Sequence, residues 1–281
     1  MVSMNRLDKS RQAQVIRCLI DGNSIRATVR ITGVAKNTIV KLLAEIGPAC
    51  SRYQDATLRN LPCKRIQADE IWSFVGAKQK NVPADKKDAL GFGDVWTWTA
   101  LCADTKLIVS WAVGDRNAGT AFEFMQDLAG RLANHVQLTT DGHRVYLDAV
   151  ESAFGSRVDY SMLIKLYGVE PKPENTSYSP AKCIGCREIE ISGKPNPKHI
   201  STSFVERQNL TMRMSMRRFT RLTNAFSKKL ENHVAAVALY FTYYNFCRIH
   251  QTLRVTPAME AGIADHVWGV EEIVNLLGDK Q

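Results

Sequence analysis

The sequence predicts an α/β fold in which a mixed sheet flanked by helices follows a small all-α N-terminal domain. Two observations carry this prediction. Residues 9–46 place apolar side chains at helical spacing throughout. Residues 66–161 instead alternate β-rich and amphipathic segments, in the order three strands, helix, strand, helix, strand. Short strands interrupted by amphipathic helices are typical of a sheet whose faces are covered by helices.

The first domain, residues 1–48, has the pattern of a helix-turn-helix. Ser24 is suited to cap a second helix, Gly33 to form the turn, and a third helix begins at Lys36 or Asn37 and ends at Gly47 and Pro48. Recognition helices read base edges with their N-terminal residues. The predicted DNA contacts in this domain are Lys36, Asn37, Thr38 and Lys41. An ordinary three-helix cap on a larger domain is the alternative.

A polar linker at residues 49–64 leads into the second domain, residues 65–281. The strands predicted there are residues 66–75, 95–103, 107–113, 136–140 and 158–161, with the second and third forming a hairpin. Helices are predicted at residues 118–133 and 145–154, and from residue 201, with breaks, to about 246. Residues 171–200 are rich in Pro, Ser, Asn and Lys, which predicts a loop or flap.

Composition narrows the class of protein. The formal net charge of +9 favours a polyanionic partner. Seven cysteines, an odd number, and a start without the features of a secretory signal predict a cytoplasmic chain with reduced thiols. The apolar stretch around residues 234–247 is too short to span a bilayer, so no membrane role is expected.

Three acidic residues stand out by their context. Asp69 lies within an apolar β segment, Asp141 ends another strand, and Glu206 opens a helix. Carboxylates gathered from separate elements repel one another, and two Mg²⁺ (or Mn²⁺) ions would relieve this repulsion. Paired metals activate the attacking oxygen and stabilise the leaving oxygen of a phosphodiester. The alternative is a structural role for each acid, such as Asp141 capping the following helix. Glu70 competes with Asp69, because adjacent strand residues face opposite sides and only one is expected to point into the site.

The helix after Glu206 strengthens the catalytic interpretation. Glu206 is the only acid from residue 206 to 229, among many arginines. A metal-binding acid beside guanidinium groups suits DNA cleavage, because arginine binds phosphate through paired hydrogen bonds. The predicted DNA contacts here are Arg207, Asn209, Arg213, Arg217, Arg218 and Arg221. A solvated basic face is the alternative.

Two further motifs remain open in the sequence. His143 follows Asp141 by two residues, which suits contact with DNA or with a reacting water, but equally a surface loop. Cys183 and Cys186 form a C-x-x-C pair, which is half of a zinc site. His199 lies downstream, but no second pair has a suitable spacing, so a flap with free thiols is the alternative.

Four segments resemble the transposases of the insertion-sequence-1 group, within the DDE transposase class. They are QADEIWSFVG (67–76), LTTDGHRVY (138–146), ISTSFVERQNLTMRMSMRRFTRLTNAFSKK (200–229) and YYNFCRIHQTLRVTPAMEAG (243–262). The resemblance implies an RNase-H-like catalytic core, magnesium dependence and strand transfer at the ends of a mobile element. It identifies Asp69, Asp141 and Glu206 as the DDE triad.

The resemblance also sets expectations about partners. They are double-stranded DNA, as element ends and target, and further copies of the chain in a synaptic complex, in the nucleoid region of a bacterial cytoplasm. Relatives often carry a cysteine-rich zinc motif ahead of the helix-turn-helix, whereas the first 20 residues here hold only Cys18. The competing functions are a repressor that uses the helix-turn-helix alone and an RNase-H-like nuclease acting on RNA–DNA hybrids.

Overall fold

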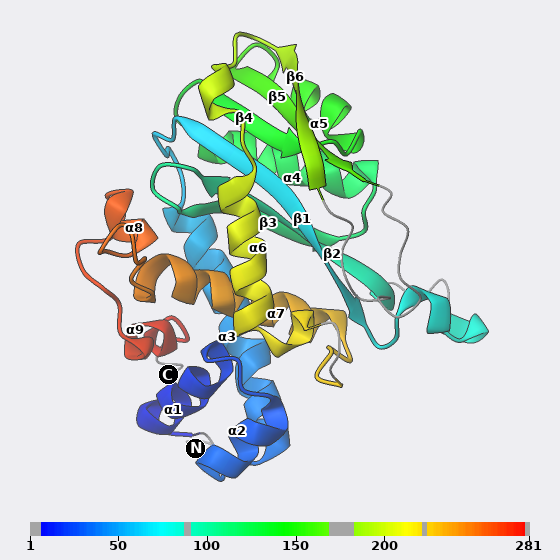
Figure 1. Cartoon of the computed structure of the whole chain (residues 1–281). Helices are drawn as coiled ribbons and strands as arrows, with labels where there is room; N and C mark the ends of the chain where they lie inside the picture. Colours follow the sequence, from blue (N-terminus) through cyan, green and yellow to red (C-terminus); the bar gives the residue numbers. More distant parts are fainter. Residues whose placement is uncertain (1–6, 87–90, 169–182, 221–223, 279–281) are drawn as a thin grey trace.

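The computed structural model describes residues 7–86, 91–168, 183–220 and 224–278. A six-stranded sheet with strand order β3-β2-β1-β4-β5-β6 lies at the centre, with helices on both faces (Figure 1). The strands are β1 (Arg65–Val75), β2 (Gly93–Cys102), β3 (Ile108–Gly114), β4 (Val136–Asp141), β5 (Val158–Tyr167) and β6 (Cys183–Ser192). The predicted mixed sheet flanked by helices is therefore confirmed.

The sheet is antiparallel on one side of β1 and parallel on the other. β1 pairs antiparallel with β2, which continues into the predicted hairpin with β3. On its other side β1 runs parallel to β4, and β4 runs parallel to β5. Parallel neighbours need a crossover connection, and α4 (Ala118–Arg131) and α5 (Val145–Phe154) occupy the two crossovers. The carboxyl ends of β1 and β4 consequently point the same way.

Each face of the sheet has its own apolar core. On one face, Ala68 and Trp98 pack with residues of α4 and α5. On the other, Ile71 packs with residues of α3 (Lys36–Thr57), α6 (Ser203–Ser215) and α7 (Leu230–Thr242). Figure 1 shows α6 crossing in front of the sheet and α4 and α5 behind it. Because side chains alternate along a strand, successive residues of β1 enter different cores.

The N-terminal helices form as predicted. α1 (Lys9–Ile20) and α2 (Ile25–Thr32) are separated by a turn, and the Ser24 hydroxyl accepts the backbone N–H of Ala27 at 3.1 Å. Gly33 ends α2 with φ of 69°, a left-handed conformation that glycine adopts without steric cost. These helices share an apolar core with α7.

The predicted end of the third helix at Gly47 and Pro48 is wrong, because α3 continues to Thr57. A proline inside a helix removes one hydrogen bond, and packing of α3 against α7 offsets that loss. Gln54, in the extra turns, donates to the Ala238 carbonyl at 3.1 Å and to the Thr242 hydroxyl at 2.7 Å. Much of the predicted linker, residues 49–64, is thus helical, and the division into domains 1–48 and 65–281 stays a prediction.

The loop predicted at residues 171–200 is partly wrong. Residues 183–192 form β6, which pairs antiparallel with β5, while residues 169–182 lie outside the described ranges. Most side chains of β6 are exposed. Residues 188–192 do alternate polar and apolar side chains, a strand signal that the loop prediction for the whole segment overlooked. β5 itself extends to Tyr167, beyond its predicted end.

The remaining elements are short. They are a π-helical turn (Tyr243–Cys247), α8 (Pro257–Glu260), α9 (Val270–Asn275) and 3-10 turns at Gln79–Asn81, Ala84–Lys86, Pro197–His199 and Arg217–Phe219. Within the described ranges, none of the helices has the length and apolar character that a membrane span requires.

The crossing of α3 and α7 generates a stability prediction. A Cβ atom on Gly47 would lie 2.3 Å from both Cα and Cβ of Ala235, so Gly47→Ala should lower the free energy of unfolding by roughly 1–3 kcal/mol. Gly119→Ala, in α4, is the matched control, because its Cβ would meet only the Asn117 side chain at 3.5 Å. Urea denaturation measures both variants, and equal stability for the two would contradict the close packing.

Candidate active site

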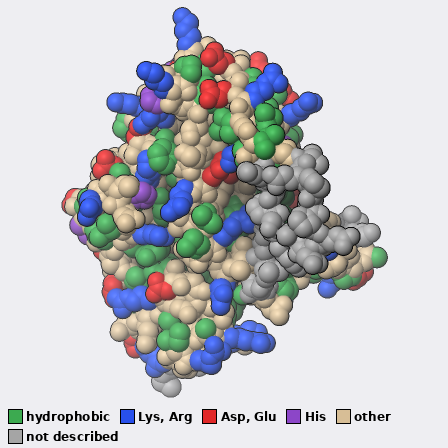
Figure 2. All heavy atoms as spheres, in the orientation of Figure 1, with side chains coloured by type: hydrophobic (Ala, Val, Ile, Leu, Met, Phe, Trp, Pro, Cys, Tyr) green, Lys and Arg blue, Asp and Glu red, His purple; other side chains and the backbone are tan. Residues whose placement is uncertain are grey.

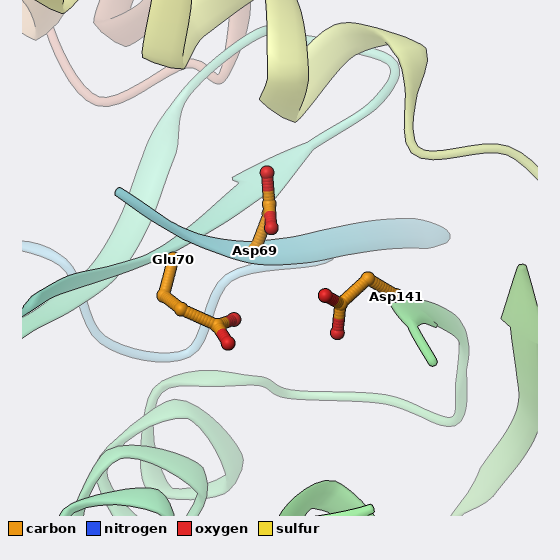
Figure 3. A group of neighbouring side chains, drawn as sticks. All are labelled: Asp69, Glu70 and Asp141. Carbon is orange, nitrogen blue, oxygen red and sulfur yellow. The ribbon is translucent and has the colours of Figure 1, made fainter. Parts of the chain in front are cut away.

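Three carboxylates meet where β1 passes the end of β4. Asp69, Glu70 and Asp141 each offer an oxygen, and these oxygens lie within 4.8 Å of one another (Figure 3). The register explains the meeting, because Ala68 pairs with Thr140 across the parallel strands. The next residue on each strand is an aspartate. Residues distant in the sequence are thus brought together by backbone pairing.

Asp69 and Glu70 leave β1 on opposite faces, as strand geometry requires (Figure 3). Asp69 accepts a hydrogen bond from Asn209 of α6 at 2.8 Å, and Glu70 accepts one from Tyr146 of α5 at 2.9 Å. The expectation that only one of the two approaches the site is wrong, since both reach Asp141. Asp141 is the last residue of β4, so its side chain is accessible from both faces.

Glu70 is committed to protein partners. Its side chain is only 1% exposed, and its two oxygens accept from Arg116 Nε at 2.6 Å and from the Tyr146 hydroxyl. Burial raises the pKa of Glu70, and Arg116 opposes that rise. A buried carboxylate with both oxygens hydrogen-bonded anchors its neighbours. The ligand role therefore falls to the less engaged carboxylates.

Asp69 carries unrelieved electrostatic repulsion. Burial raises its pKa to about 7, with further contributions from the negative charges of Glu70, Asp141 and Glu206. Its partner Asn209 is buried, and among the described residues the Oδ1 atom of that amide has no hydrogen-bond partner. A cation near Asp69 would relieve the repulsion, and the amide oxygen is a hard acceptor of the kind that such cations bind.

The structure does not bring Glu206 into the group of three. Glu206 lies in the first turn of α6, where Lys165 of β5 and the Thr202 hydroxyl donate to its carboxylate. The helix nevertheless faces Asp69, because Asn209, one turn later, contacts it. The charge of Glu206 also contributes to the raised pKa of Asp69. Glu206 is therefore adjacent to the site and paired with a lysine.

His143 lies against the site. Its backbone N–H donates to Asp141 Oδ1 at 3.0 Å, and its ring stacks on Trp98. Burial and the nearby Arg116 charge lower the pKa of His143, which favours the neutral imidazole. The buried Nε2 atom has no hydrogen-bond partner within the described part of the chain.

The predicted DNA contacts differ in their exposure. Figure 2 shows lysines and arginines spread over the face that α6 crosses. The exposed ones are Lys36, Asn37, Lys41, Arg207 and Arg217, while Thr38 and Arg213 are half-buried. These positions suit contact with a DNA backbone, and they stay predictions.

Two of the predicted contacts are placed differently, and a third is not described. Asn209 is buried against Asp69, so it is not on the surface that phosphates reach. Arg218 donates to the Ser227 hydroxyl at 2.7 Å, and burial lowers its pKa to about 10. Arg221 lies outside the described residues. Position on a helix did not distinguish these inward side chains from exposed ones.

Cys183 and Cys186 are exposed on β6. Over the described ranges, no third histidine, cysteine or carboxylate joins them in a group able to hold a metal.

The residues present fit a hard divalent cation. Asp69 and Asp141 supply carboxylate oxygens at one point, and the raised pKa of Asp69 reflects its burial and the nearby negative charges, both of which a bound cation would offset. Oxygen donors suit magnesium or manganese rather than zinc. The unpartnered Asn209 oxygen is a further hard donor beside them.

Sequence reasoning missed three neighbours of the site, namely Arg116, Tyr146 and Lys165. Each reaches a carboxylate that is remote in the sequence. No local motif marks them, because their proximity depends on the strand order. Had the strand order been predicted, it would have pointed to Lys165, because Lys165 lies on β5, the strand next to β4.

Comparisons with known proteins were made for the whole chain. No protein-family model and no curated protein matches it. Among solved structures, it is similar to a piggyBac transposase synaptic complex with hairpin DNA, at 10% identity over 96% of this chain and 69% of that one, with a TM-score of 0.42. A Mos1 strand transfer complex is similar at 14% identity over 56% of this chain and 58% of that one, with a TM-score of 0.24. A Mos1 paired-end complex with the left transposon end is similar at 12% identity over 54% of this chain and 59% of that one, with a TM-score of 0.22. Likeness at this level does not establish a shared fold.

The raised pKa of Asp69 generates a prediction about stability and pH. In the fold its carboxyl has a pKa of about 7, against 3.8 ordinarily, so the charged form costs stability above about pH 7, and this cost fades as the pH falls towards 4. Asp69→Asn should therefore raise the free energy of unfolding by roughly 2–4 kcal/mol at about pH 8, without added metal, and by progressively less in acid.

The control for this prediction is Glu151→Gln, which changes an exposed acid on α5 and should alter stability by less than about 0.5 kcal/mol at either pH. Denaturant titrations across the pH range measure the difference. A constant offset between Asp69→Asn and the unmutated protein would show that repulsion does not act on Asp69.

Proposed function

We propose that the chain is a DNA transposase of the DDE class with an RNase-H-like catalytic core. In this proposal it binds the ends of a bacterial insertion sequence and catalyses metal-dependent strand cleavage and strand transfer. The observation that carries the proposal is the meeting of Asp69, within β1, and Asp141, at the end of the parallel strand β4, with oxygens within 4.8 Å. The mixed sheet and the basic helix α6 support it.

Asp69 and Asp141 would hold Mg²⁺ or Mn²⁺, with Glu206 as the third carboxylate and two ions expected. When bound, such ions activate the attacking oxygen and stabilise the leaving oxygen of a phosphodiester. Asn209 fixes the Asp69 carboxylate through a hydrogen bond of 2.8 Å. Lys165 balances the charge of Glu206 from β5. Fixed partners of this kind reduce the reorganisation needed during reaction.

The proposal extends to DNA end recognition. The N-terminal end of α3 carries exposed Lys36, Asn37 and Lys41 after the Gly33 turn, as in helices that read a major groove. Arg207 and Arg217 are exposed nearer the carboxylates and suit phosphate contacts. The partners are element ends and target DNA, with further copies of the chain in a synaptic complex. On the resemblance noted in the sequence, the proposal assigns the chain to the insertion-sequence-1 group, acting in a bacterial cytoplasm at the nucleoid.

A repressor that used only the helix-turn-helix would leave the acidic site unexplained. Burial, together with the nearby charges of Glu70 and Asp141, raises the pKa of Asp69 to about 7, which costs stability. A protein that only bound DNA gains nothing from that cost. The transposase proposal explains why the carboxylates are clustered, because binding a cation requires the same arrangement.

Glu206→Gln is predicted to reduce magnesium-dependent cleavage of an element end by about 10²–10³-fold or more, the scale for losing an essential electrostatic group. Folding should persist, because the ion pair with Lys165 is about one third exposed on each side and such pairs contribute little. DNA affinity should be equal or higher, since a negative charge is removed. Cleavage and mobility-shift assays at matched salt measure these quantities.

Glu123→Gln supplies the control, because it changes an exposed glutamate on α4 in the same way. It should cleave at the unmutated rate. If Glu206→Gln also cleaves at that rate, Glu206 is not the third carboxylate and the DDE assignment fails.

Asn37→Ala is predicted to weaken binding to the element's own end by about 1–3 kcal/mol while leaving binding to unrelated DNA unchanged, because a base contact is lost rather than a phosphate contact. The measurement is a competition assay between end DNA and random DNA. Thr57→Ala, at the far end of the same helix, should not alter the ratio. An equal loss of affinity for end DNA and random DNA would show that Asn37 does not contact a base of the element end.

A further inference from the structure

We propose that Arg116 is a binding site for a DNA phosphate beside Asp141. Nothing in the sequence pattern marks this residue, which lies in the turn between β3 and α4. The inference rests on the proposed function, since it names a group that holds the substrate of the acidic site. Its basis is the way the guanidinium is held.

The inner part of the Arg116 guanidinium is held by two neighbouring side chains. Its Nε donates to Glu70 Oε1 at 2.6 Å, and its guanidinium carbon lies 4.8 Å from the centre of the Trp96 ring. Glu70 is itself held by the Tyr146 hydroxyl at 2.9 Å. An arginine whose orientation is set in advance loses less entropy when it binds a ligand.

The outer end of the same guanidinium is unoccupied by hydrogen bonds. Among the described residues, no hydrogen bond is found from Nη1 or Nη2, and Nη2 lies 3.7 Å from Asp141 Oδ2, an ion-pair distance. The side chain is 38% exposed. Paired outer N–H groups in a fixed fork match two oxygens of a phosphate.

Arg131 shows how the same protein uses an arginine for structure alone. Its Nε donates to Asp127, its Nη2 to Asp55, and its Nη1 to the carbonyls of Gln54 and Leu58, and its side chain is 10% exposed. All three nitrogens of Arg131 are therefore used. Arg116 uses one and has the other two beside Asp141, on the face of the sheet that Glu70 and Trp96 occupy.

The position agrees with the charges of the site. Figure 3 shows the Glu70 and Asp141 carboxylates turned towards each other, from β1 and β4. Arg116 is within ion-pair distance of both, and over the described ranges no other lysine or arginine forms an ion pair with either carboxylate. A phosphate approaching three carboxylates is repelled by them, and a fixed guanidinium offsets that repulsion.

The experiment measures DNA affinity by fluorescence anisotropy at several salt concentrations, with a short duplex and with Ca²⁺ as a hard cation for the carboxylates. Arg116→Gln should weaken binding about tenfold and reduce the slope of log affinity against log salt by about 1, because one phosphate contact is lost. Arg157→Gln is the matched control. Arg157 is an exposed arginine beyond the far end of α5, and its loss should leave the slope unchanged.

A second variant addresses folding, since Arg116→Gln leaves the buried Glu70 without its counter-ion. Arg116→Lys keeps the positive charge and a partner for Glu70 but lacks the paired N–H groups with which a guanidinium binds two phosphate oxygens. It should keep the salt slope and bind about threefold to tenfold more weakly. Unchanged affinity of Arg116→Lys, or equal effects of Arg116→Gln and Arg157→Gln, would overturn the proposal and leave Arg116 as a structural partner of Glu70.

These outcomes are distinct from a failure of the proposed function. Affinity is read without any cleavage, so Arg116 can bind phosphate in a chain that proves not to cut DNA. Conversely, a chain in which Glu206→Gln abolishes cleavage remains a transposase even if Arg116 has no effect on the salt slope. A wild-type chain without affinity for the duplex would overturn both.

Discussion

The parallel pairing of β1 with β4 is the interaction on which the site depends. Its register sets Ala68 opposite Thr140, and the aspartates that follow on each strand meet as a result. Backbone hydrogen bonds thereby hold together charges that would separate in an unconstrained chain. The crossover helices α4 and α5 exist because the strands are parallel, and one of them supplies the hydroxyl that fixes Glu70.

Two adjacent acids of β1 have different environments because they enter different faces of the sheet. Glu70 is buried beside α5 with both oxygens satisfied, so it behaves as part of the scaffold. Asp69 faces α6, where its partner is an amide and its pKa rises to about 7. A single-residue shift of register would exchange these environments, which makes strand alignment a determinant of site chemistry.

The sequence allowed most helices and strands to be predicted, because burial imposes periodicity on them. It failed where burial was unusual. The continuation of α3 past Pro48 rests on contacts with α7, which a local pattern does not contain. β6 is exposed, and its alternation at residues 188–192 was overlooked within a segment predicted as a loop. Asp69 and Asp141 were predictable from context within strands, whereas the partners Arg116 and Lys165 depend on register and strand order, and the pairing of Glu206 with a lysine was not foreseen.

The uninterrupted helix α3 has a geometric consequence. Its 22 residues, at about 1.5 Å each, form a rod of about 33 Å, close to the length of one turn of DNA, about 34 Å. One end carries the exposed Lys36 and Asn37, and the other is fixed to α7 through Gln54. Because α3 is continuous between these ends, Lys36 and Asn37 are held at a fixed distance from α7. Under the proposed function, this helix would set the number of base pairs between the DNA that it contacts and the DNA at the acidic site.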